Sequence, residues 1–224
     1  MQRIGWLSVF ALVTSALMPL PAAKAQAGKW KVIDKTSEGF EIALREEPGR
    51  DLPSLRGRGV LKGDILQLLA IILDAGRATE WAEGASEVKA LRTKGLVAEI
   101  VYAYSELTWP VSDRDVITKT VMTVKKPGEK YRLHMTALPD FRPEKDGVVR
   151  IKFSDTSFTL EKRGDGKVWV EYIVNVDPGG SLPKWLVRWA SKKIPGDTLR
   201  KLQEQLGKTK GQYDGVIAKL RAAT

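Results

Sequence analysis

The sequence predicts an α+β fold in which helices cover one face of a curved antiparallel β-sheet. Two strand-like segments come first, an apolar helical segment follows, and alternating strands then run from about 87 to 176. The last third carries an amphipathic helical pattern from 181 to 206. Strands and helices that are segregated along the chain in this way are typical of α+β domains. The 224 residues, 43% of them hydrophobic, suffice for one domain with a full core.

The segment 1–27 has the features of a secretory signal peptide. Arg3 supplies a positive charge, residues 4–20 are mostly apolar, and Ala-x-Ala cleavage sites follow at 23–25 and 25–27. An uncleaved membrane anchor is the alternative, because about 17 apolar residues are the lower limit for a transmembrane helix. The chain has no Cys, which excludes a lipid-modified cysteine anchor and disulfide bonds. We therefore expect an exported protein, periplasmic or secreted after cleavage.

The N-terminal part of the domain combines three strands with two helices. Residues 30–36 and 40–46 flank a Ser-Glu-Gly turn and predict a hairpin. Asp64 precedes the run ILQLLAIIL, a pattern typical of a capped and buried helix over 65–74. The remaining predicted elements of this part are a third strand at 54–61 and a short helix at 78–83.

From residue 87 onward, alternating segments separated by turn residues predict an antiparallel meander. Lys-Pro-Gly-Glu at 126–129 and Gly-Asp-Gly at 164–166 are the clearest hairpin turns. The predicted strands are 87–93, 96–106, 115–125, 130–138, 148–153 with 157–162, and 167–176. One face of 116–125 carries no charge, whereas the other carries Lys119 and Lys125 and is expected to face solvent.

The last strand is expected to stop at Asp-Pro-Gly-Gly, 177–180, because proline lacks a backbone donor and glycine readily adopts positive φ. Ser181 is the predicted N-cap of the following helix, with Pro183 in its first turn. Apolar residues then recur at three- and four-residue spacing through Leu206. We expect Pro195 to kink or interrupt this helix.

Two strings resemble sequences of one family. The first is the strand-ending D-x-x-G at 177–180 followed by a helix that begins L-P-x-W-L at 182–186, and the second is WPVSDRDV at 109–116. Both are similar to the corresponding segments of START (steroidogenic acute regulatory protein-related lipid transfer) domains, over about 30–206. The resemblance implies a helix-grip fold, in which the curved sheet wraps around the long C-terminal helix. It also implies non-catalytic lipid binding and transfer.

Small side chains on one predicted strand face leave room for a ligand. Val101, Ala103 and Ser105 share one face of 96–105 by alternation, and the charge-free face of 116–125 belongs to the next strand. Small residues also permit close helix packing, which is the alternative interpretation. Together with the resemblance, the pattern implies an apolar lipid cavity. The expected cavity residues are Val101, Ala103, Thr118, Thr120, Met122, His134, Arg150, Tyr172, Leu186 and Trp189.

Polar groups in such a cavity must be paired or must contact the ligand, because an isolated buried charge is unfavourable. The candidates for orienting a lipid head group are Glu99, His134, Arg150 and Tyr172. Arg114 and Asp115 are expected to form a structural ion pair where their strand begins. Some sterol-binding relatives place an acidic residue and an arginine in the cavity, and the resemblance puts these positions at Val101 and Thr120. The expected ligand is therefore a phospholipid, a sterol-like or another apolar molecule, and nothing singles out cholesterol.

The loop 105–114 is expected to form a gate together with the start of the C-terminal helix. The resemblance places this loop beside the cavity opening. Trp side chains next to Lys and Arg favour the interfacial layer of a membrane. The expected gate and membrane-contact residues are Trp109, Pro110, Val111, Leu182 and Trp185.

The C-terminal region is strongly basic. Ten Lys or Arg and three acidic residues lie between 184 and 224, in a chain of net charge +10. Such a surface would attract an anionic membrane transiently, and a solvated face that aids solubility is the alternative. The basic residues lie in no recognised nucleic-acid-binding module, so we expect no nucleic acid partner. We expect a monomer with a lipid-binding domain at 28–206 and a basic tail at 207–224 that extends the helix.

Enzymatic functions have little support in the residues. With one His and no Cys, a catalytic triad would have to use His134, which lies in a predicted strand without a nucleophile elbow. The sequence has no clustered metal ligands and no glycine-rich phosphate loop, so we expect no catalytic residue, cofactor or metal. A polyketide cyclase or aromatase on the same fold is the alternative, and it would need His134, Tyr172 and Arg150 in the cavity. A further alternative is a cationic surface protein with a solid core and no ligand.

Overall fold

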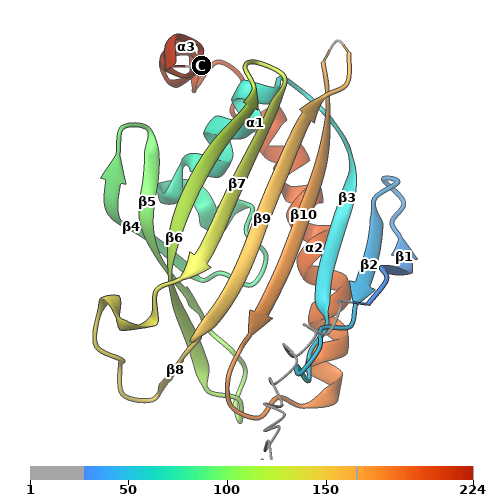
Figure 1. Ribbon diagram of the computed structural model, residues 1–224, viewed down its shortest axis with the longest axis vertical. Coiled ribbons are helices and arrows are strands. Elements are labelled where there is room, and N and C mark those ends of the chain that lie inside the picture. The colour runs from blue at the N-terminus through green and yellow to red at the C-terminus, as the bar shows by residue number, and fades with distance from the viewer. Residues whose placement is uncertain (1–27, 165, 224) are drawn as a thin grey trace, which may run out of the picture.

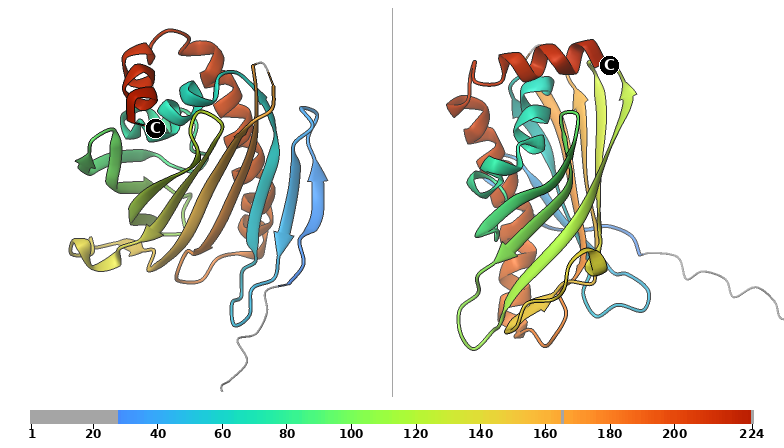
Figure 2. Two further views of the ribbon diagram at one scale, coloured as in Figure 1. Left: turned by 45° about the horizontal axis from the view of Figure 1, so that its top comes forward. Right: turned by 90° about the vertical axis from the view of Figure 1, so that its left-hand side faces the viewer.

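The computed structural model describes residues 28–164 and 166–223, so the predicted signal peptide lies outside the described residues. One curved sheet of ten strands forms a layer, and helices cover its concave face (Figures 1 and 2). The strands are β1 Lys31–Lys35, β2 Glu41–Arg45, β3 Ser54–Lys62, β4 Glu87–Lys94, β5 Val97–Ser105, β6 Asp113–Lys126, β7 Lys130–Ala137, β8 Val148–Arg150, β9 Phe153–Lys162 and β10 Lys167–Asp177. The helices are α1 Ile65–Leu73, α2 Lys184–Lys208 and α3 Asp214–Ala223, with 3₁₀ turns η1 Ala75–Glu80 and η2 Pro139–Phe141. This is the predicted α+β fold.

The sheet order is β1-β2-β3-β10-β9-β7-β6-β5-β4, and all of these neighbours are antiparallel. The third and the last strand in sequence, β3 and β10, are therefore adjacent. Two of the predicted elements differ. The strand expected at 148–153 is only the three-residue β8, which pairs in parallel with the start of β6. The short helix expected at 78–83 is the 3₁₀ turn η1, which begins directly after α1.

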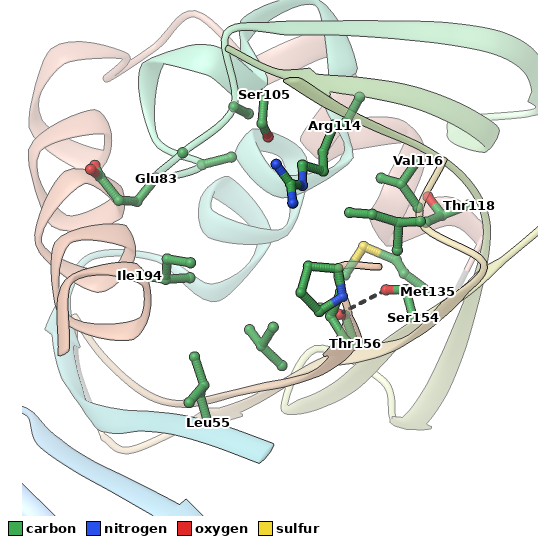
Figure 3. Close-up of a pocket in the computed structure, with 18 of the residues that line it drawn as sticks. Leu55, Glu83, Ser105, Arg114, Val116, Thr118, Met135, Ser154, Thr156 and Ile194 are labelled. Atoms are coloured by element: carbon green, nitrogen blue, oxygen red, sulfur yellow. Dashed lines mark hydrogen bonds between the residues drawn. The ribbon is translucent and has the colours of Figure 1, made fainter. Parts of the chain in front are cut away.

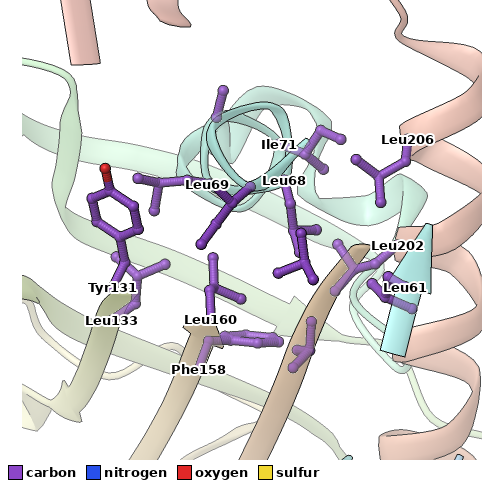
Figure 4. Packing of buried hydrophobic residues seen from close by; sticks show 14 of the residues in the cluster. Leu61, Leu68, Leu69, Ile71, Tyr131, Leu133, Phe158, Leu160, Leu202 and Leu206 are labelled. Atoms are coloured by element: carbon purple, nitrogen blue, oxygen red, sulfur yellow. The ribbon is translucent and has the colours of Figure 1, made fainter. Parts of the chain in front are cut away.

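Helix α1 lies at the centre of the hydrophobic core. Asp64 caps its first turn, because its Oδ1 accepts hydrogen bonds from the backbone N–H groups of Leu66 (2.9 Å) and Gln67 (3.0 Å). Leu68 and Leu69 are fully buried between the sheet and α2, where Figure 4 shows the cluster. A helix that is apolar on nearly every side is thus buried on nearly every side, as the sequence predicts.

Helix α2 runs along the open side of the curved sheet (Figure 2), and its 25 residues span about 37 Å. The predicted N-cap at Ser181 is wrong, since Pro183 is the N-cap. Of the two alternatives at Pro195, an interruption is wrong because the helix continues through this residue, and a kink stays a prediction. A proline inside a helix removes one backbone hydrogen bond. Here Pro195 is buried against Gly57 of β3, and this packing offsets the missing hydrogen bond.

The two halves of α2 are held in different ways. In the C-terminal half, Leu199 and Leu202 are fully buried, and the Gln203 amide exchanges hydrogen bonds with the backbone N–H (2.7 Å) and carbonyl (2.9 Å) of Lys62. In the N-terminal half, residues 184–194, the side-chain bonds of the described chain stay within α2 itself. Among the described residues, no side-chain hydrogen bond or ion pair joins this half to the sheet, and the side chains that it turns toward the sheet are mainly apolar.

The basic tail is helical, but it does not extend α2. The chain turns after Thr209, where Gly211 has φ +79°, and returns as the separate helix α3. Tyr213 anchors the turn, because its hydroxyl donates to Asp74 Oδ2 at 2.9 Å, and Leu220 of α3 is buried. The tail therefore adds to the core beside α1.

The convex face of the sheet also has a buried cluster. Ile100, Tyr102 and Ile117 are at most 6% exposed, and Leu138 packs against them. This face of β6 was expected to meet solvent. The expectation is wrong near Ile117, because the segment between β7 and β8 folds back over it.

Candidate functional site

A cavity of about 410 Å³ lies between the concave face of the sheet and the N-terminal half of α2. Figure 3 shows side chains from the strands on one side and Ile194 of α2 on the other. The cavity stays open because the strand residues that face it are small or medium-sized, such as Ala103 and Thr118. The C-terminal half of α2, by contrast, sits on the leucine-rich core. The walls of the cavity are mainly apolar, and the cavity volume is in the range of small-molecule pockets, about 300–1,000 Å³.

Seven of the expected cavity residues line this space. They are Val101 and Ala103 of β5, Thr118 and Thr120 of β6, Tyr172 of β10, and Leu186 and Trp189 of α2. The predicted gate residue Leu182 and the small residue Ser105 line it as well. Strand alternation in β5 and β6, together with the apolar spacing of α2, therefore predicted two opposite walls of the cavity. Their part in binding lipid stays a prediction.

Three expected cavity residues lie elsewhere. Met122 is on the same face of β6 as Thr120 but packs against the core cluster at the α1 end. His134 is partly exposed on the opposite face of β7, where its Nε2 lies 2.7 Å from Asp155 Oδ1. Alternation explains this placement, because both sequence neighbours of His134 line the cavity and a strand residue faces away from its neighbours. The head-group candidate Glu99 is also outside, paired with Arg92 at 2.9 Å.

Arg150, the third residue outside the cavity, forms a buried ion pair with Asp115. Its Nε and Nη2 donate to the two carboxylate oxygens at 2.6 and 3.1 Å, and both side chains are 1% exposed. The carboxylate raises the pKa of Arg150. The guanidinium also donates to three backbone carbonyls of the segment that covers the convex cluster, those of Pro139, Arg142 and Pro143. This pair therefore holds that segment against β6.

The predicted ion pair between Arg114 and Asp115 is accordingly wrong. Adjacent residues in a strand face opposite sides of the sheet, so Asp115 reaches Arg150 while Arg114 points into the cavity (Figure 3). Arg114 is 4% exposed and donates to the carbonyls of Ser112 and Gly179, the latter at 3.3 Å. Burial lowers the pKa of Arg114 below its ordinary value.

A second pocket of about 310 Å³ adjoins the cavity at Arg114 and Leu182, which line both spaces. The β5–β6 loop contributes Pro110 and Val111, and the start of α2 contributes Pro183. Two of the expected gate segments therefore meet there, at one end of the molecule (Figure 1).

Three Trp side chains are exposed at this end. Trp109 in the loop is 88% exposed, and Trp185 and Trp189 on α2 are 62% and 43% exposed. The base of the loop is fixed by Asp113, which accepts a hydrogen bond from the Leu107 backbone N–H at 2.8 Å and another from the Tyr104 hydroxyl. The bond to Asp113 raises the pKa of Tyr104 to about 12. The loop thus presents Trp109 from a fixed base.

Sequence reasoning missed the walls that come from other elements. Trp81 and Ala82, at and just after the end of η1, close one side, and Met135, Thr156 and Ile194 contribute elsewhere. The same alternation applied to β7 and β9 would have found Met135 and Thr156.

The described residues contain no acidic or His cluster that could hold a metal. Within the same residues, the helices lack the length and hydropathy needed to cross a bilayer.

The comparisons with known proteins agree with this architecture. Residues 19–211 match the family model of the START domain. The phosphatidylcholine transfer protein of Rattus norvegicus is 34% identical over 172 residues, which cover 73% of this chain and 77% of that protein. An uncharacterised protein of Pseudomonas aeruginosa is 30% identical over 182 residues, 81% of this chain and 89% of that protein.

A solved structure agrees as well. The STAR-related lipid transfer protein of Xanthomonas axonopodis superposes with a TM-score of 0.70 at 28% identity, covering 80% of this chain and 98% of that one. Sequence family and fold therefore agree, and the two relatives named here for a function are lipid transfer proteins. The chain belongs to the START domain family.

Proposed function

We propose that this chain binds one lipid in the cavity between the sheet and α2 and transfers it between membranes without catalysing a reaction. The observation that carries the proposal is the apolar cavity of about 410 Å³. Each buried CH₂ group of an acyl chain contributes about 0.8 kcal/mol before ordering costs, so such a space alone favours a hydrocarbon tail. The relatives named phosphatidylcholine transfer proteins make a phospholipid the first candidate.

The N-terminal half of α2 and the 105–114 loop serve as the gate. Residues 184–194 contact the sheet through apolar side chains, so their displacement breaks no buried hydrogen bond or ion pair of the described chain. The C-terminal half stays attached through Gln203, and through Lys201, whose Nζ lies 2.5 Å from Glu83 Oε2. Opening therefore needs only a swing of one half-helix away from the sheet.

The gate end contacts an anionic membrane surface. Trp109 and Trp185 are the most exposed aromatic residues of the described chain, and Lys184 and Arg188 are exposed beside Trp185 on α2. This combination suits the interfacial layer, where indole rings and cations are both favourable. The protein acts as a monomer after export to the periplasm or beyond. N-terminal sequencing of the protein from the periplasmic fraction tests the export, because a mature chain that still contains residues 4–20 would contradict it.

The cyclase alternative would need three polar side chains in the cavity. Tyr172 lines it, whereas His134 and Arg150 lie outside. A surface protein with a solid core is also disfavoured, because the space beneath α2 is hollow.

The test measures bound lipid and transfer with a cavity-filling variant. Ala103 lines the cavity, so Ala103→Trp fills part of it and should reduce both co-purified phospholipid and vesicle-to-vesicle transfer of labelled phosphatidylcholine by about tenfold or more. Ala90→Trp places the same side chain at an exposed position of β4 and should leave both unchanged. A wild-type protein that yields no lipid by mass spectrometry and transfers none would refute the proposal.

A further inference from the structure

Arg114 is a buried cation with no carboxylate within ion-pair distance in the described chain, and the charge of Asp113 favours it only from farther away. Within the described chain its guanidinium donates to two backbone carbonyls, and its Nε has no hydrogen-bond partner although it is fully enclosed. The neighbouring Asp113 is committed to Tyr104 and Leu107. Carbonyl dipoles only partly compensate a buried charge, which is normally paired with a carboxylate or phosphate.

Arg150 shows how this fold satisfies a buried guanidinium when the chain itself supplies the anion. It has a bidentate carboxylate at 2.6 and 3.1 Å in addition to three carbonyls. Arg114 has two carbonyls and no carboxylate. The difference between the two arginines is one missing bidentate anion.

The surroundings of Arg114 favour an anion as well. The second pocket, which Arg114 shares with the cavity, is bordered by Gly180, Ser181 and the N-cap Pro183 of the 25-residue helix α2. This helix has no side-chain cap hydrogen bond and no acidic residue in its first turn. Its N-terminal backbone N–H groups and the helix dipole therefore add positive potential beside the guanidinium.

We propose that Arg114 binds the anionic head group of the ligand, a phosphate or carboxylate, in the second pocket while the tail occupies the cavity. This inference rests on the proposed lipid-binding function. Arg114 stands where the two spaces meet, so an amphiphile placed across the junction satisfies its guanidinium and buries its own hydrocarbon at the same time. The head group then lies at the gate end, beside the β5–β6 loop.

The test compares amphiphiles of equal chain length and different head groups. Hexadecanol, palmitate and hexadecyl phosphate each displace the neutral fluorescent probe phenylnaphthylamine from the purified, delipidated protein. One charge-assisted bidentate contact predicts that both anionic amphiphiles bind wild type about tenfold to a hundredfold more tightly than hexadecanol. Arg114→Gln should remove most of that preference. Arg132→Gln removes the same charge from an exposed position of β7 and should keep it.

A second variant covers the case in which Arg114→Gln fails to fold. Val111→Glu leaves Arg114 in place and adds a carboxylate to the wall of the second pocket, where it competes for the guanidinium. The preference for anionic amphiphiles should again fall by about tenfold. Circular dichroism and thermal unfolding confirm that the compared variants are folded.

The outcomes separate this inference from the proposed function. Hexadecanol that binds as tightly as palmitate to wild type overturns the head-group assignment and leaves lipid binding intact. No displacement by any amphiphile overturns both. Inorganic phosphate that binds wild type without displacing hexadecyl phosphate would make the pocket a site for free anions, which also overturns the assignment.

Discussion

At the scale of single residues, the two neighbours Arg114 and Asp115 have separate structural tasks. Asp115 faces the convex side and holds Arg150, and through it the segment between β7 and β8. Arg114 faces the concave side, where two cavities meet. Strand alternation alone divides the tasks, because successive side chains point to opposite faces. Arg114 and Asp115 suggest one ion pair in the sequence, but in the structure they make two unrelated sets of contacts.

Asp115→Asn is expected to destabilise the fold strongly. The substitution removes the carboxylate charge and leaves Arg150 buried with carbonyl partners alone, which should lower the free energy of unfolding by about 3–5 kcal/mol. Urea denaturation measures the change. Glu129→Gln is the control, because it breaks the exposed pair with Lys126 (51% and 64% exposed) and should cost less than about 1 kcal/mol. Equal losses in the two variants would show that the buried pair is not structural.

At the scale of elements, α2 lies unusually close to β3. A Cβ added to Gly57 would lie 2.9 Å from Pro195 Cβ and 3.2 Å from Leu199 Cδ1. Pro195 therefore fits inside the helix because the strand beneath it has no side chain at the crossing point. The contact fixes the place where the anchored half of α2 ends and the half over the cavity begins.

Gly57→Ala should push α2 away from β3. The overlap predicts a loss of about 1–3 kcal/mol in the free energy of unfolding, measured by chemical denaturation. Gly207→Ala lies in the same helix with no heavy atom within 4 Å of the added Cβ, and it should stabilise the protein by up to about 1 kcal/mol. If Gly57→Ala were as stable as wild type, the close approach would not be what positions the helix.

The sequence predicted the element order and two walls of the cavity because both depend on local periodicity. Val101, Ala103, Thr118 and Thr120 follow from strand alternation, and Leu186 and Trp189 from helical spacing. What it could not predict depends on contacts between distant segments. Pro195 is tolerated because of Gly57, and Ile117 is buried because another loop covers it. His134 faces away from the cavity by strand alternation, because both of its neighbours in β7 line the cavity.

At the scale of the whole molecule, one end gathers the features of a membrane contact. Trp109 and Trp185 are exposed on adjacent segments, and the second pocket lies between those segments. The proposed membrane contact would gain long-range attraction to anionic lipid from the basic chain, whose net charge of +10 includes Arg3 and Lys24 of the predicted signal peptide. Aromatic insertion is insensitive to salt, whereas the charge attraction is not, so the two contributions can be separated.

Binding to vesicles that contain phosphatidylglycerol should shift the Trp fluorescence to shorter wavelength. Raising the salt from about 0.1 M to 1 M shortens the screening length from about 10 Å to 3 Å and should weaken binding severalfold. Trp109→Ala and Trp185→Ala should each reduce vesicle binding, whereas Phe141→Ala, an exposed aromatic residue on the convex side, should not. No spectral shift, or unchanged binding by both Trp variants, would disprove the gate as the membrane contact.

The uneven attachment of α2 should give uneven hydrogen–deuterium exchange along its backbone. We expect the amides of residues 186–194 to exchange through a local opening, because no side-chain hydrogen bond or ion pair of the described chain ties that stretch to the sheet. Amides of residues 199–206 belong to the buried core and exchange only when the whole domain unfolds. We therefore expect two cooperative units within this one helix, so that the proposed gate opens at a free-energy cost well below that of unfolding the domain.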